Sequence, residues 1–187
     1  MKIEDIKRAP IELLFCSSPL AFSKLIMWST SEPVSHVAID MPNEREIIHS
    51  DLVGVHSVPR MDFLNAHKVS ATFKIWLGES DANQVATRMQ DVVDNLEGGM
   101  YDFGALTYFA IRLTATKFLG VPFPKRNLWG DSDAYLCTEA AGLLVRVIAE
   151  VTGKKLIPDS VDLGITAPWA LYELLKAGAG GKNEMEI

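Results

Sequence analysis

The sequence has few cysteines, no long apolar segment and no signal-like N-terminus. Only 2 of its 187 residues are cysteines, Cys16 and Cys137, which is too few for the disulfide framework of a small secreted domain. No apolar stretch is long enough to cross a bilayer, so no transmembrane segment is expected. The first eight residues carry charges of both signs, which is not the pattern of a secretory signal. We therefore expect a cytoplasmic protein with free thiols.

The chain also lacks an excess of basic residues. Its net charge is -6 and its isoelectric point is about 5.2. An acidic protein of this kind is not expected to bind a nucleic-acid backbone, and its charge does not favour anionic membranes. The composition, 48% hydrophobic and 22% charged, is typical of a globular protein that fills a core.

The hydrophobic pattern changes from strand-like to helix-like along the chain. We find no repeat and no internal linker, so residues 1–176 are predicted to form one α+β domain, with an antiparallel sheet packed against helices. Residues 177–187 are rich in glycine, alanine and charge and are predicted to be disordered. The predicted strands are 11–16, 34–40, 45–50, 53–58 and 69–77, and the predicted helices are 20–28, 80–97, 104–119, one that follows the loop at 129–133 and carries Cys137, and a short one from 166, with a helical turn at 59–66.

Cys137 begins a segment whose apolar residues have helical spacing. A helix N-terminus supplies partial positive charge and N–H groups, which lower the pKa of a thiol and can hold an oxyanion. Ser132 or Asp133 is placed to cap this helix. The same pattern also fits a buried core cysteine, so the residues alone leave both interpretations open. Cys16 lies in an apolar strand and is predicted to be a core residue.

His36 and His49 lie on consecutive predicted strands. If these strands pair through a turn near Asn43, the two positions come close to facing each other. His49 would then hold one nitrogen of His36 while the other nitrogen faces a thiol. A packed or hydrogen-bonded core histidine is the alternative for His36. His56 and His67 show no such relation and are predicted to be surface or loop residues.

A metal ion is a competing use of the same histidines, with His56 or Asp102 as a third ligand. The spacing matches no compact zinc pattern such as His-Glu-x-x-His. We therefore predict no metal ion and no cofactor.

Tyr101 follows the pair Gly98-Gly99, which is predicted to end a helix. A tyrosine placed there can point into a cleft, and its hydroxyl can donate to an oxyanion. A core tyrosine with a satisfied hydroxyl is the alternative.

In their order and spacing, these segments resemble the circularly permuted branch of the papain-like NlpC superfamily, most closely the YiiX-like proteins. In that branch the strand with the histidine precedes the helix with the cysteine. The resemblance extends over residues 11–175. The matching pieces are Ser-His-Val-x-Ile (Ser35 to Ile39), Ile47-Ile48-His49, Gly54-Val55, Tyr-Asp-Phe (Tyr101 to Phe103) and Tyr-x-Cys-Thr-Glu (Tyr135 to Glu139).

The resemblance implies a papain-like cysteine hydrolase in which Cys137 is the nucleophile and His36 the base. It assigns His49 to orienting His36, and Tyr101 or a backbone N–H to the oxyanion. One departure concerns His49, because YiiX-like proteins usually have a glutamate there. The lecithin retinol acyltransferase group and many NlpC enzymes have a histidine as third residue.

The implied activity is that of a peptidase or amidase that forms a thioester acyl-enzyme with a peptide or peptidoglycan substrate. A lipid or ester acyl hydrolase or acyltransferase is the first alternative. The second is a catalytically inactive binding or structural protein, which would be virion-associated if the chain is encoded by a phage. The sequence does not predict the oligomeric state.

Overall fold

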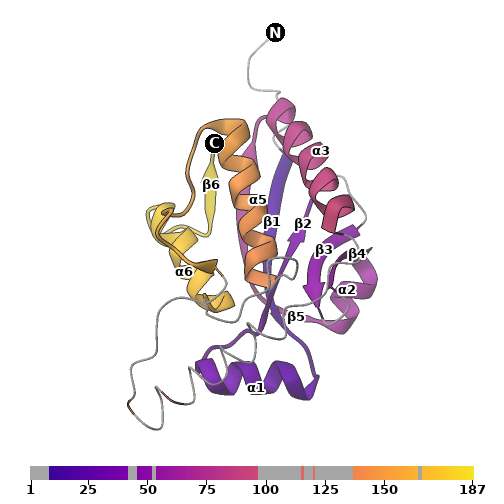
Figure 1. Ribbon diagram of the computed structural model, residues 1–187, viewed down its shortest axis with the longest axis vertical. Coiled ribbons are helices and arrows are strands. Elements are labelled where there is room, and N and C mark those ends of the chain that lie inside the picture. Colours follow the sequence, from indigo (N-terminus) through magenta and orange to yellow (C-terminus); the bar gives the residue numbers. More distant parts are fainter. Residues whose placement is uncertain are drawn as a thin grey trace.

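One mixed six-stranded sheet organises the chain, and its strand order is β4-β3-β2-β1-β5-β6 (Figure 1). The computed structural model describes residues 9–41, 46–51, 54–96, 137–163 and 166–187, with Ala115 and Gly120. The strands are β1 (Ala9–Ser17), β2 (His36–Asp40), β3 (Glu46–Asp51), β4 (Gly54–Pro59), β5 (Lys68–Leu77) and β6 (Glu184–Glu186). The helices are α1 (Ala21–Thr30), α2 (Arg60–Ala66), α3 (Glu79–Leu96), α5 (Cys137–Thr152) and α6 (Pro168–Gly178). The predicted α+β class is confirmed.

The central strand is β1, which pairs antiparallel with both β2 and β5. It is covered on both faces, which explains why its sequence is almost continuously apolar rather than alternating. Ile11, Leu13 and Phe15 point to one face, and Leu14 and Cys16 to the other, where they belong to different core clusters. The burial predicted for Cys16 is confirmed, since its side chain is fully buried.

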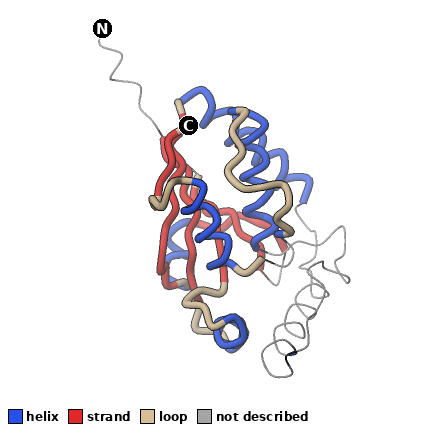
Figure 2. The backbone as a smooth tube through the Cα atoms, turned by 90° about the vertical axis from the view of Figure 1, so that its left-hand side faces the viewer, coloured by secondary structure: helices blue, strands red, loops and turns tan. Residues whose placement is uncertain are grey.

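The two faces of the sheet are covered unequally (Figures 1 and 2). On one face, α3, α5 and α6 bury the larger cluster, with apolar residues of α5 such as Leu144 and Ile148 in its centre. On the other face, the short helix α2 contributes Phe63 to a smaller cluster with Leu14, Cys16, Ala38 and Ile47. The smaller cluster leaves room beside α2, and the candidate site lies there.

The C-terminal segment differs from the prediction of a disordered tail at 177–187. Helix α6 runs to Gly178, and β6 pairs parallel with β5, placing Ile75 beside Met185. Side chains hold the turn between them, because Tyr172 Oη donates to Asn183 Oδ1 at 2.9 Å and Trp76 Nε1 to Glu184 Oε2 at 3.1 Å. Residues 184–186 carry no apolar pattern because an edge strand largely exposed to solvent is held mainly by its backbone.

The prediction of no transmembrane segment agrees with the described helices, none of which combines the length and the apolar character needed to span a bilayer. The predicted helix 104–119 and the glycine pair Gly98-Gly99 lie outside the described residues.

Candidate functional site

His36 and His49 meet on the sheet face that α2 covers. Their register differs from the predicted one, because His49 faces Ala38 rather than His36, so the two histidines are diagonal neighbours. His49 Nδ1 lies 3.3 Å from His36 Nε2, and the rings meet edge-on at 86° with centroids 5.4 Å apart. One ring nitrogen of each histidine is therefore committed to the other.

The prediction that His56 and His67 have no relation to His36 and His49 is wrong, although His67 does lie in the link between α2 and β5, as a loop residue. His56 faces His49 directly across β3 and β4, with ring centroids 4.5 Å apart. His67 follows α2, stacks on Phe63 at 4.1 Å and lies 5.6 Å from the ring of His36. All four histidines of the sequence, His36, His49, His56 and His67, thus form one group, which we call the histidine cluster.

The sequence carried a signal for one of these two residues. Only positions 52 and 53 separate β3 from β4, and a link this short implies pairing of 49 with 56. The placement of His67 depends on how α2 packs back on the sheet, for which the sequence offers no local signal.

Burial makes the imidazoles of His36 and His49 poor cations. Desolvation, followed by the charges of His49, His67 and His56, holds the pKa of His36 well below its usual range. Desolvation and the charge of His56 lower the pKa of His49 to about 4, although Asp51 acts in the opposite direction. Both rings are therefore neutral at pH 7, and each offers a lone pair that can accept a proton or bind a metal ion.

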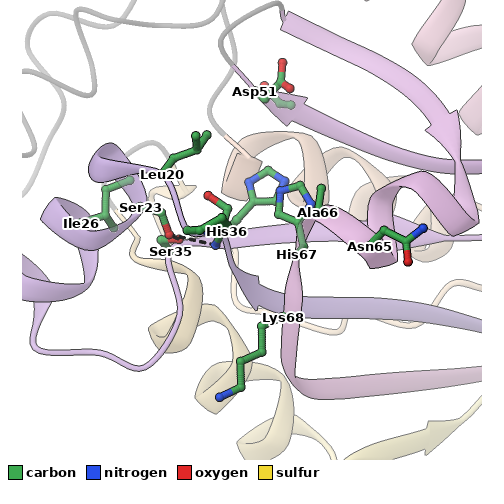
Figure 3. A pocket seen from close by; sticks show the side chains of 13 residues that line it. Leu20, Ser23, Ile26, Ser35, His36, Asp51, Asn65, Ala66, His67 and Lys68 are labelled. Atoms are coloured by element: carbon green, nitrogen blue, oxygen red, sulfur yellow. Dashed lines mark hydrogen bonds between the residues drawn. The ribbon is translucent and has the colours of Figure 1, made fainter.

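A cavity of about 680 Å³ opens beside His36 (Figure 3). Pro19, Leu20 and Ile26 give one wall an apolar character, while Lys68 and Asp51 contribute charge. Space of this size, with an apolar wall and a few polar groups, suits an acyl chain or a peptide segment.

Two serines attach α1 to the start of β2 at this cavity. Ser23 Oγ and Ser35 Oγ are 2.6 Å apart, and Ser18 N–H donates to Ser23 Oγ at 3.0 Å. Since Ser35 directly precedes His36, this buried contact fixes the strand end from which His36 enters the cavity.

Cys137 begins α5, where the prediction placed it within the first turn or so, but the pKa of its thiol is raised rather than lowered. Burial, the largest effect, raises the pKa of the thiol from 9.0 to about 11, while the N–H groups of Val37, Thr138 and Cys137 act in the opposite direction. The expected lowering of the pKa is therefore wrong for this structure, because desolvation outweighs the helix N-terminus.

The thiol of Cys137 and the imidazole of His36 belong to different faces of the sheet. Cys137 packs in the larger cluster with Val37, whereas His36, one position earlier, shares its face with Ala38 and Phe63. Among the described residues, no hydrogen bond joins Cys137 to His36 or His49. The other predicted site residue, Tyr101, and the predicted cap residues Ser132 and Asp133 lie outside the described part of the chain.

Three groups of the site have the donor atoms of a metal ligand set. His49, Asp51 and His56 each offer one ligand atom, and these atoms lie within 4.8 Å of one another. Two imidazoles and a carboxylate favour borderline divalent ions such as Zn²⁺.

A pH profile of alkylation tests the state of the thiol. In a Cys16→Ala background, iodoacetamide should label Cys137 little at pH 8, where a pKa raised to about 11 leaves about a hundredfold less thiolate than an ordinary thiol has. The labelling rate should still be rising above pH 10, as followed by intact-protein mass. Fast labelling at pH 7 that His36→Asn removes would instead establish a thiolate–imidazolium pair.

No family model and no curated protein matches the chain. Among solved structures, the chain is similar to one described as the crystal structure of metalloprotein yiiX from Escherichia coli O157:H7, DUF1105. The sequence identity is 16%, the TM-score is 0.48, and the match covers 95% of this chain and 83% of the other. A likeness of this extent does not transfer a ligand or an activity.

Proposed function

We propose that this protein is a cysteine hydrolase of the permuted papain-like type, which forms a thioester acyl-enzyme on Cys137. The observation that carries the proposal is the hydrogen-bonded pair of His49 Nδ1 and His36 Nε2, 3.3 Å apart at the wall of the cavity. A base oriented by a second residue is the core of an activated nucleophile. Cys137 also lies at the start of α5, beside the backbone N–H of Val37. Val37 directly follows the proposed base His36 in β2.

The protonation states of Cys137 and His36 at rest define the chemical step. At rest both the thiol and His36 are neutral, because burial raises the pKa of the first and lowers that of the second. The proposed step uses the tautomer in which His36 donates Nε2–H across the 3.3 Å contact to His49 Nδ1, which leaves the lone pair of His36 on Nδ1. Acylation then requires His36 to turn toward the N-terminus of α5 when substrate enters.

The reaction follows from that geometry. His36 Nδ1 takes the proton of Cys137 as the sulfur bonds to the carbonyl carbon, and a backbone N–H or the hydroxyl of Tyr101 stabilises the oxyanion. The imidazolium then returns its proton to the leaving amine, and a thioester remains. Water, deprotonated by the same imidazole, cleaves the thioester and releases the acid and the free thiol.

A second candidate substrate is an acyl-lipid ester, which the cavity wall favours. Leu20 lines the cavity and is 62% exposed, and Leu25 and Trp28 of α1 are also more than half exposed. An exposed apolar residue in the lining, such as Leu20, suits a fatty acyl chain better than a charged peptide. The thiol chemistry would be the same for both substrates.

The test is capture of the acyl-enzyme. Wild-type protein is incubated with activated acyl amides and acyl esters of graded chain length, and intact mass and peptide mapping locate the adduct. We expect one adduct, on Cys137, and the preferred donor decides between amide and lipid ester. Adducts on other residues, or none with any donor, would identify the protein as a binding or structural protein instead.

A further inference from the structure

The histidine cluster contains one imidazole nitrogen that its protein neighbours do not satisfy. His49 is only 4% exposed, and its Nε2 is buried without a hydrogen-bond partner among the described residues. A buried polar atom left unpaired costs about 1–3 kcal/mol, so such atoms usually mark a function or a bound ion. In a neutral imidazole this nitrogen is either an unpaired donor or an unpaired lone pair, depending on the tautomer.

Two neighbours of His49 are of the kinds that bind transition metal ions. Asp51 and His56 place one ligand atom each within 4.8 Å of that of His49. Asp51 also lines the cavity, through which an ion and a water ligand can enter. Three protein ligands with one position left for water are typical of Zn²⁺ sites that are not purely structural.

The second histidine has the supporting contact that metal-binding imidazoles use. The ring of His56 bonds through Nδ1 to the carbonyl oxygen of Gly54 at 3.0 Å. When that contact is an N–H donation, the lone pair of the ring lies on Nε2, and its orientation is fixed by the backbone. Gly54 itself adopts φ 110°, a conformation that suits glycine and presents this carbonyl to the ring.

We propose that His49, Asp51 and His56 form a binding site for a divalent transition metal ion of the Zn²⁺ class, and that its occupation switches off His36 as a base. The first part rests on the geometry above, and the second part rests on the proposed function. A metal ion on His49 Nε2 requires the ring proton of His49 to be on Nδ1. That proton is then donated across the 3.3 Å contact to His36 Nε2.

The direction of one hydrogen bond thus distinguishes the two states. In the metal-free protein His36 donates to His49, and the lone pair of His36 Nδ1 is available for the thiol proton. In the metal-bound protein His49 donates to His36, so the proton of neutral His36 lies on Nδ1 and no lone pair remains there. Metal binding and thiol activation exclude each other through His49, without any contact between the ion and Cys137.

The binding experiment uses full-length protein without a polyhistidine tag, titrated with ZnCl₂ by calorimetry and with Co²⁺ by visible absorption. We expect one ion per chain at micromolar concentration. His56→Gln and Asp51→Asn should each weaken binding by about a hundredfold or more, since even outer-sphere changes weaken metal affinity about 10- to 100-fold. His67→Gln is the matched control, because it changes the same cluster outside the ligand set, and it should bind as wild type does.

Cys137→Ser separates this site from a cysteine-containing one and should bind Zn²⁺ as wild type does. The site is overturned if wild type does not bind Zn²⁺ or Co²⁺, if His56→Gln binds as tightly as His67→Gln, or if Cys137→Ser loses binding. Thermal unfolding of each variant without metal confirms that a loss of binding is not a loss of fold.

The coupling experiment measures acyl-enzyme formation with saturating Zn²⁺ and after addition of a chelator. Zn²⁺ should slow acylation more than tenfold in wild type and His67→Gln, reversibly, and should have little effect in His56→Gln. If Zn²⁺ binds but does not slow acylation, the proposed effect of the metal ion on His36 is wrong, while the metal site itself is not contradicted. Binding by a protein that forms no acyl-enzyme, even with chelator, would overturn the proposed function alone.

Discussion

Replacing Cys137 with serine is expected to slow acyl-enzyme formation by up to about 10⁶-fold. Serine nearly preserves the shape of the side chain, and its hydroxyl can accept from the N–H groups that face the sulfur, including that of Val37. A hydroxyl is a much weaker nucleophile than a thiol, and a neutral imidazole with a lowered pKa is a weak base for it. The measurement is the rate of acyl-adduct formation in single-turnover conditions, followed by intact mass.

The other cysteine provides the matched control. Cys16 is buried on the opposite face of the sheet, and burial raises its pKa as well. Cys16→Ala should therefore form the adduct at the wild-type rate within about twofold. A lowered midpoint of thermal unfolding would measure the cost of the small void that the lost sulfur leaves in the core. If Cys137→Ser reacts at a rate comparable to wild type, or Cys16→Ala does not react, the nucleophile has been misassigned.

Phe63→Ala is expected to lower the free energy of unfolding by about 3–5 kcal/mol. Phe63 is 2% exposed, anchors α2 to the smaller core cluster, and is stacked on His67 with centroids 4.1 Å apart. Its ring also lies edge-on to His49 at 5.2 Å, so its removal admits water to the histidine cluster. Urea unfolding followed by circular dichroism measures the loss.

Met61→Ala tests whether this effect belongs to the buried face of α2. Met61 lies on the same helix but is 65% exposed, and its replacement should change the stability by no more than about 0.5 kcal/mol. Equal losses in the two variants would show that α2 contributes through helix propensity and not through the packing of Phe63.

The strands could be predicted from the sequence because their patterns are local. The alternation around His36 and the apolar run ending at Cys16 gave β2 and β1 within a few residues of their observed ends. The contact between His36 and His49 was also predicted, although by direct rather than diagonal pairing. A shift of two residues in register keeps each side chain on the same face of the sheet, so His36 and His49 still come into contact.

The rest depends on packing between distant segments. Whether the N-terminus of α5 activates or merely buries Cys137 is decided by how closely the helix lies on β2, which no residue near position 137 encodes. His67 joins the cluster only because α2 folds back over the sheet through Phe63. Of the proposed metal ligand set, His49 and His56 were considered from the sequence but Asp51 was not, because the three residues come from two strands, β3 and β4, rather than from a compact motif.

The pairing of β6 with β5 has a consequence for synthesis on the ribosome. Trp76 and Glu184 are 108 positions apart, so β5 emerges long before the strand that covers its outer edge. During that interval the nascent chain presents an unpaired strand edge rich in apolar residues, of the kind that recruits chaperones or other nascent chains. Residues 184–186 therefore pair with β5 late in synthesis, and deleting them should increase aggregation more than it alters the histidine cluster at the other end of the sheet order.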